Sequence, residues 1–156
     1  SLTMSHFTDH QLKLLTAAEG KTLKKVVVYF WVNRFNPDAH IDLIDNVELV
    51  FTDDTSLVIT STEDGTGIDT LENFNFEEEK AHLKQEFGDK IKMIPIDAST
   101  TKMWTDVIGE TIEAFELSRE DEQFLNDALI INFGTEKRSI GISPNDGLII
   151  DYWEDI

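Results

Sequence analysis

The sequence contains no cysteine and few basic residues, and both absences exclude classes of function. Without cysteine, the 156-residue chain has no disulfide, no thiolate metal ligand and no cysteine nucleophile. This fits a reducing compartment, and we expect the protein to be cytoplasmic. Only 13 lysines and arginines accompany 31 aspartates and glutamates, for a formal net charge of −18. That charge repels nucleic-acid phosphates and anionic lipid, so neither nucleic acid nor a membrane is an expected partner.

Long apolar runs are also missing. No run approaches the roughly 20 residues that a membrane-spanning helix needs, and no basic segment followed by an apolar one marks a signal peptide at the start. Hydrophobic residues nevertheless make up 40% of the chain and aromatic residues 10%, enough for a packed core. We therefore expect one folded domain over residues 1–156.

Two parts of the chain resemble each other at nearly constant spacing. The stretch "KLLTAAEGKTLKKVVV", from Lys13, aligns with "KMWTDVIGETIEAFEL", which starts 89 residues later at Lys102. The stretch "DNVELVFTDDTSLVITSTEDG", from Asp45, aligns with "DALIINFGTEKRSIGISPNDG", which starts 82 residues later at Asp127. The first copy therefore carries seven extra residues, around "NRFNPDAHID". We predict an internal duplication, with units of approximately residues 8–72 and 100–156 and a connector over residues 73–99.

Each predicted unit contains a helix, a glycine, a strand, a hairpin and a last strand. In the first unit, Thr8 and Gln11 have the spacing of a capping box. In the second, Ser99 or Thr100 is the expected N-cap of a shorter helix that ends at Gly109. The two Ser-x-x-Asp-Gly stretches, which end at residues 65 and 147, are predicted to be equivalent turns that close the hairpins.

The predicted fold class is α+β, with antiparallel sheets and flanking helices. The nearly continuous apolar run Val26–Val32 is typical of a central strand covered on both faces. In the connector, Asn75 is the expected cap of a helix over Phe76–Phe87, and Lys90–Ile96 is an expected strand that Pro95 confines to an edge. A unit of about 55 residues is marginal alone, so the two units should share a core. The alternative is two small sheets joined by the connector helix.

No motif in the chain indicates catalysis or cofactor binding. There is no nucleophile elbow, no phosphate-binding glycine loop and no dinucleotide fingerprint. The acidic stretches "TDDT", "TEDGTGID" and "DYWED" lack the spacing of a calcium-binding loop. His6 and His10 have the spacing of a zinc pair, but His6 precedes the predicted helix. We expect a protein that is not an enzyme, with no cofactor and no metal site.

The acidic surface favours a basic protein as partner, or it serves solubility alone. The first hypothesis is a small non-enzymatic binding module, with a bacterial immunity or inhibitor protein for a basic toxin as its specific form. An alternative is a small-molecule or divalent-cation site at the seam between the repeats, and an enzyme of unrecognised type is a third. Most aromatic residues are expected in the core, whereas Trp153 is the expected exposed anchor. The candidate partner-binding residues are Asp53, Asp54, Glu63, Asp64, Asp69, Asp151, Trp153, Glu154 and Asp155. The sequence predicts no oligomeric state.

Overall fold

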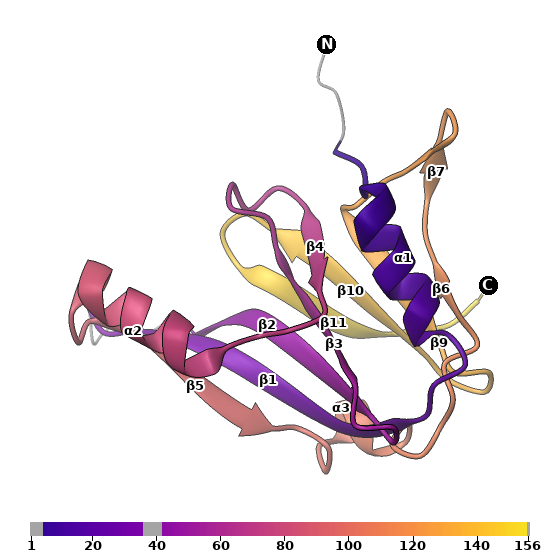
Figure 1. The fold of residues 1–156 in the computed structure, drawn as a ribbon, viewed down its shortest axis with the longest axis horizontal. Coiled ribbons are helices and arrows are strands. Elements are labelled where there is room, and N and C mark those ends of the chain that lie inside the picture. The colour runs from indigo at the N-terminus through magenta and orange to yellow at the C-terminus, as the bar shows by residue number, and fades with distance from the viewer. Residues whose placement is uncertain (1–4, 36–41, 156) are drawn as a thin grey trace.

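The computed structural model describes residues 5–35 and 42–155, which form a curled, mostly antiparallel sheet of nine strands, a two-stranded sheet of β7 and β8, and three helices (Figure 1). The first predicted unit contains α1 (Asp9–Ala18), β1 (Leu23–Asn33), β2 (Asp42–Phe51), β3 (Ser56–Ser61) and β4 (Ile68–Leu71). The connector contains α2 (Phe76–Phe87) and β5 (Ile91–Asp97). The second unit contains α3 (Lys102–Thr105), β6 (Ala114–Glu116), β7 (Arg119–Glu120), β8 (Gln123–Phe124), β9 (Ala128–Asn132), β10 (Lys137–Ser143) and β11 (Gly147–Trp153). This mixed architecture confirms the predicted α+β class.

The starts of α1 and α2 follow from local sequence. Thr8 and Gln11 form the predicted capping box: the Thr8 side chain accepts from the Gln11 amide, and the Gln11 side chain accepts from the Thr8 amide. Asn75 accepts from the Glu78 amide at 3.1 Å, and α2 ends at Gly88, which has φ of +63°. These side chains satisfy donors that a helix leaves unpaired in its first turn.

The helix of the second unit is shorter than expected and begins later. It is a single turn, Lys102–Thr105, and its N-cap is Thr101 rather than Ser99 or Thr100. The Ser99 hydroxyl is engaged elsewhere, because it accepts from the Val26 amide at 3.0 Å and donates to Asp97 at 2.6 Å. Ser99 therefore ties the chain to β1 and cannot cap α3.

Strand pairing separates the sheet into two antiparallel parts. Strands β1 to β4 pair in chain order, and β5 lies along the other side of β1. Strands β6, β9, β10 and β11 also pair in chain order. The parts are joined by one parallel pair, Gly147 with Ile44, in the described strands. β5 is an edge strand, as Pro95 predicts.

The hairpins of the two units differ by one residue. Val50 pairs with Ser56 and leaves a five-residue connection, whereas Asn132 pairs with Lys137 and leaves four. Ser56 and Lys137, the first paired residues after the two connections, are therefore 81 residues apart, one fewer than the 82 of the sequence alignment.

The units also meet where each leaves its helix. The hydroxyls of Thr22 and Thr111 are 2.9 Å apart, and the two residues form an isolated antiparallel bridge. Around them lie four backbone hydrogen bonds in reciprocal pairs: Leu23 N to Glu110 O and Ile112 N to Lys21 O, Gly20 N to Ile112 O and Gly109 N to Leu23 O. Gly20 and Gly109 have nearly equal φ, +87° and +88°.

The main hydrophobic core contains residues from both units. Its fully buried members include Leu23, Leu49, Phe51, Trp104, Ile112, Leu129 and Ile140. A smaller cluster under α2 contains Tyr29, Leu83 and Met93. Because Val26 and Val28 are in the main core and Tyr29 is in the smaller cluster, β1 is covered on both faces, as its apolar run predicts.

Candidate functional site

The predicted partner-binding residues do not converge on one place. Asp53 and Asp54 lie in the turn before β3, and Glu63 and Asp64 lie in the turn after it, so these pairs are at opposite ends of that strand. Asp69 is in β4. The remaining four residues, from Asp151 to Asp155, are at the end of β11 and just beyond it. The structure therefore separates the acids into distinct surfaces.

At the turn between β2 and β3, the acids are paired within the chain. Lys21 Nζ is 3.2 Å from Asp53 Oδ2, and Lys24 Nζ is 3.0 Å from Asp54 Oδ1. The Thr55 hydroxyl and amide donate to Asp53, and these bonds, with the Lys21 ammonium, lower the pKa of Asp53 to about 2. Charge at this turn is largely neutralised.

The acids near β4 serve local structure. Asp64 accepts hydrogen bonds from the hydroxyls of Thr62 and Thr66, at 2.7 and 2.8 Å, and these lower its pKa. Asp69 accepts from Gln11 Nε2 at 2.7 Å, which ties β4 to α1. Only Glu63 in this group is exposed without such a role among the described residues.

The C-terminal group lies beside the face of β9, β10 and β11 that points away from the core. Side chains of β9, β10 and β11 that point away from the core form what we call the open face: Ala128, Ile130, Asn132, Lys137, Ser139, Gly141, Ile149, Asp151 and Trp153. Ile149 and Trp153 are 48% and 45% exposed, so this face carries two large apolar side chains in water. The helices pack elsewhere, α1 against β3, β4 and β6, and α2 against β5.

Lys137 binds Asp155, just beyond β11, next to the open face. Its Nζ is 2.8 Å from both Glu116 Oε2 and Asp155 Oδ2, and the hydrogen bond to Asp155 is the main reason that the pKa of Lys137 is raised. The pKa of Asp155 is lowered by the same contact. Lys137 is directly opposite Trp153 across the strand pair, so the ammonium fixes the backbone next to the exposed indole. Glu154 is exposed.

Arg138 supports β11 from the other face. Its side chain is fully buried, Nε donates to Met103 O at 2.7 Å, and Nη1 donates to Glu136 Oε2 at 2.9 Å. The guanidinium lies over the ring of Tyr152, which is 49% exposed. The two aromatic residues at the end of β11 therefore lie on opposite faces of the strand, each next to a cation.

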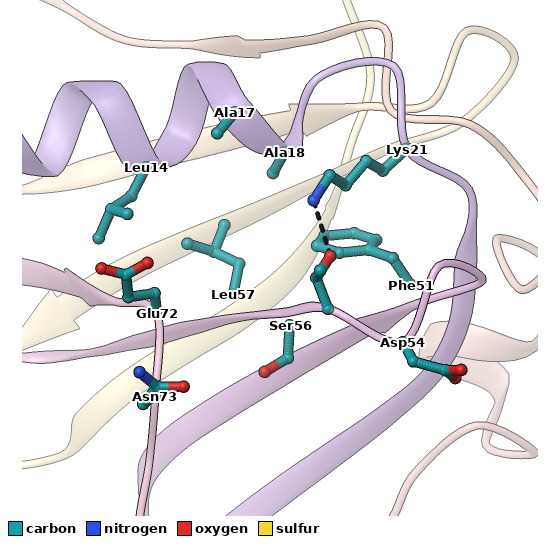
Figure 2. Close-up of a pocket in the computed structure, with 11 residues that line it drawn as sticks. Leu14, Ala17, Ala18, Lys21, Phe51, Asp54, Ser56, Leu57, Glu72 and Asn73 are labelled. Carbon is teal, nitrogen blue, oxygen red and sulfur yellow. Dashed lines mark hydrogen bonds between the residues drawn. The ribbon is translucent and has the colours of Figure 1, made fainter.

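Among the described residues, several grooves lie away from the open face. The first, about 370 Å³, lies between α1 and the hairpin of β2 and β3, with Leu14 and Leu57 along it, Glu72 at one end and Lys21 at the other (Figure 2). A second, about 310 Å³, lies between α2 and β5 and includes Lys80, Lys84 and Lys92. A third, about 210 Å³, is lined by Leu12, Leu15 and Thr16 of α1, by Glu19 just after it, and by Phe115, Leu117 and Phe124.

The third groove is at the seam where the alternative hypothesis expects a site. It is mostly apolar, and its Glu19 carboxylate already accepts from the Phe115 amide at 2.9 Å. Within the described ranges, no three acids or histidines lie close enough together to hold a metal ion. His6 forms an isolated bridge with Leu125, and His10 is in α1. The mostly apolar lining of this groove suits an apolar group.

Several residues of this surface were not predicted from the sequence. Ile149, Lys137 and Glu116 come close to Trp153 on the open face only through strand pairing, and Arg138 comes close to Tyr152 on the other face in the same way. Two features of the sequence could have indicated these residues: the alternation in "LIIDYW" and the adjacent bases of "EKRS" in an otherwise acidic unit. The extra loop of the first unit, including His40, falls mostly on residues 36–41 and so lies outside the described residues. None of the helices in the described ranges is long and apolar enough to cross a membrane.

Comparison with known proteins gives no relative: no family model matches the chain, and no match is found among curated proteins or solved structures.

Proposed function

We propose that the protein is a non-enzymatic binding module that docks on a basic partner protein, with an immunity or inhibitor protein for a bacterial toxin as its specific form. The observation that carries this proposal is the open face, where Ile149 and Trp153 are half-exposed beside the carboxylates of Asp151 and Glu154. Large apolar side chains surrounded by charge are typical of protein-binding anchors. The net charge of −18 favours a basic partner and fast association. The proposed location is the cytoplasm, which the lack of cysteine supports.

Affinity capture with matched variants tests this function. The immobilised protein is exposed to bacterial lysate at low salt, and retained proteins are eluted with salt and identified. We expect a basic protein that the wild type retains and that a variant with Ile149→Ser and Trp153→Ala loses. The control variant, Ile94→Ser with Ile96→Ser, removes two exposed isoleucines on β5 and should still retain it. A retained set that is identical for all three proteins, or that contains no basic protein, contradicts the proposal.

The seam groove supports the alternative of a small-molecule site, in an apolar form. Its lining of Leu12, Leu15, Phe115, Leu117 and Phe124 suits an apolar group better than a cation. A thermal-shift screen tests it: apolar metabolites should raise the melting temperature of the wild type but not of Leu12→Lys, which places a charge in the groove. Stabilisation that is equal in both proteins argues against a site at the seam.

We also propose that the chain arose by duplication of one unit. The pairs of β1 with β2 and of β6 with β9 support this, because Lys25↔Val50, Val26↔Leu49 and Val27↔Glu48 match Ala114↔Asn132, Phe115↔Ile131 and Glu116↔Ile130 at the sequence offsets of 89 and 82. The reciprocal hydrogen bonds around Thr22 and Thr111 also support it. Sequences of related proteins would test it: each unit should be more similar to the other than chance allows, in the same alignment. A relative with only one unit would strengthen it further.

A further inference from the structure

Outer strands of a sheet expose unpaired backbone groups, and proteins usually cover or blunt them. In this protein the edge of β6 is closed by Glu19, the residue just after α1, because Phe115 N donates to Glu19 Oε2 at 2.9 Å. β4 is covered by the same helix, because Gln11 Nε2 donates to Asp69 and the Thr70 hydroxyl donates to Gln11 O. These two edges are therefore closed by contacts from a distant part of the chain.

The edge of β5 is blunted by its own sequence. Pro95, in the middle of the strand, has no N–H to offer. Lys90 and Lys92, at its start, place positive charge beside the edge. An added strand would lack a central hydrogen bond there, and a basic one would be repelled.

β11 differs from these three strands. On the side away from β10 it makes the single pair of Gly147 with Ile44, and no described strand accompanies it from there to Trp153. The unaccompanied part carries two half-exposed aromatic residues, Tyr152 and Trp153, at its end. Unlike the edges of β4, β5 and β6, this edge has no helix packed against it and no proline within it in the described residues.

Backbone hydrogen bonds determine which residues of β11 face this edge. Ile142 N donates to Asp127 O at 3.2 Å, so even-numbered residues of β10 bond to the β9 side. Odd-numbered residues of β10 then bond to β11, because successive residues of a strand direct their N–H and C=O groups to opposite sides. Ser139 is opposite Asp151, so the odd-numbered residues of β11 are the ones bonded to β10. The even-numbered residues face away.

Ile150 and Tyr152 are therefore the residues that direct N–H and C=O groups outward beyond the junction with β2. The bonding of Tyr152 agrees, because its amide donates to the neighbouring Asp151 carboxylate at 2.7 Å instead of to β10. This local bond is easily exchanged, since Asp151 is exposed and a partner's carbonyl can replace it.

The charges beside this edge define the occupant that fits it. Asp151 and Glu154 are exposed carboxylates with no ion pair in the described part of the chain, and Asp155 lies next to them. Lys137 and Arg138 are the nearest cations, but both are already paired with carboxylates. An incoming chain must therefore be basic, and it must be extended to use the outward backbone groups.

We propose that the end of β11 is the place where the partner binds, by adding an extended basic segment as a further strand beside Ile150 and Tyr152. Side chains of that segment would alternate between Trp153 on the open face and Tyr152 on the other face. The proposal rests on the proposed binding function and specifies its geometry.

Two variants separate the backbone contribution from the ring. Tyr152→Ala removes the aromatic ring but keeps the outward N–H, whereas Tyr152→Pro removes both, and neither touches a hydrogen bond to β10. The probe is an eight-residue peptide of alternating lysine and valine, with a second version methylated on every other backbone nitrogen. We expect the unmethylated peptide to bind at low salt and to shift the amide resonances of Ile150 and Tyr152. Methylation can fall on the odd or on the even nitrogens of the peptide, and at least one of these two versions should bind about tenfold more weakly or worse. Tyr152→Pro should likewise bind the unmethylated peptide at least about tenfold more weakly than Tyr152→Ala.

Equal affinity for methylated and unmethylated peptides, or equal affinity of the proline and alanine variants, overturns strand addition. Circular dichroism of both variants tests whether each is folded. If Tyr152→Pro does not fold, the pair Glu154→Pro and Glu154→Ala repeats the comparison at the next residue whose backbone groups face outward. A partner captured from lysate that binds both Tyr152 variants equally also overturns strand addition, while it leaves the binding function intact. If no basic protein is captured at all, the binding function itself is contradicted.

Discussion

The guanidinium of Arg138 lies over the ring of Tyr152, with its central carbon 4.5 Å from the ring centroid. Such a contact contributes more when it is shielded from water, and the Arg138 side chain is fully buried. A charged side chain therefore fills a core position and orders the strand that we propose as the docking edge.

Replacing Arg138 separates its packing role from its charge. Arg138→Ala should lower the free energy of unfolding by about 3 kcal/mol, because it leaves a cavity and removes the donor to Met103 O. Arg138→Met keeps most of the volume and should stay within about 1.5 kcal/mol of the wild type, since well-packed apolar residues can replace buried ions. Urea unfolding measures both. Equal losses would show that the hydrogen bonds, not the packing, carry the effect.

Asp45 should make stability fall as pH rises. It is the extra residue of a bulge in β2, between Asn46 paired with Tyr29 and Ile44 paired with Phe30. Burial, then the charge of Glu79 on α2, raise its pKa to about 6 from 3.8. Because the fold favours the protonated form, this contribution is complete below about pH 4 and is lost as pH rises through about 6.

Asp45→Asn isolates that contribution. At pH 7 the variant should be more stable than the wild type by about 1 to 2 kcal/mol, and the difference should vanish near pH 4. Urea titrations of both proteins across this range measure it. Asp64→Asn is the matched control: its hydrogen bonds lower the pKa of Asp64, so its charge supports the fold and its removal should not stabilise it at pH 7. A difference between Asp45→Asn and the wild type that does not change with pH would contradict the assignment.

The glycines of the two Ser-x-x-Asp-Gly turns should respond differently to alanine. Gly65 and Gly147 both have φ of +71°, so both substitutions strain the backbone, at about 1 kcal/mol. A Cβ on Gly65 meets nothing within 4 Å, whereas one on Gly147 lies 2.5 Å from Ile44 O. Gly147→Ala should therefore cost at least about 2 kcal/mol more, because it pushes β11 away from β2. Thermal or urea unfolding of both variants tests this, and equal costs would place the junction elsewhere.

The glycines after the first helix of each unit should respond alike. Gly20 and Gly109 have nearly the same positive φ, and a Cβ on either meets nothing within 4 Å. Alanine at either position should cost about 1 to 2 kcal/mol through backbone strain alone. Gly141→Ala, at ordinary φ and with its nearest neighbour 4.0 Å away, is the control and should cost little. Urea unfolding gives the three values; a large loss at only one of Gly20 and Gly109 would show that their surroundings differ.

Local features of this fold were predictable from the sequence, and features set by distant contacts were not. The ends of α2 follow from Asn75 and Gly88, and the edge position of β5 follows from Pro95, because each acts within its own turn or strand. The cap of α3 was missed because the Ser99 hydroxyl bonds to Val26 instead. No local rule indicates a partner 73 residues away.

The candidate site shows the same division. The exposure of Trp153 was expected from its acidic neighbours. The sequence does not distinguish the acids that are paired within the chain from those exposed beside Trp153, because all are Asp or Glu in polar stretches. Asp53 and Asp54 are paired with Lys21 and Lys24, which reach them only in the folded chain. Asp69 in β4 is likewise bonded to Gln11, which is distant in the sequence.

The bridge between Thr22 and Thr111, with the backbone hydrogen bonds around it, has a consequence for synthesis on the ribosome. Leu23 is completely buried, yet its backbone bonds to Glu110 and Gly109, which are made much later. A nascent chain that ends before them has strands β1 to β5 and helix α1, but it lacks Ile112, Leu129 and Ile140, which complete the main core. The apolar core face of the amino-terminal half therefore stays partly exposed until most of the carboxy-terminal half has left the exit tunnel. The shared core can form only after that.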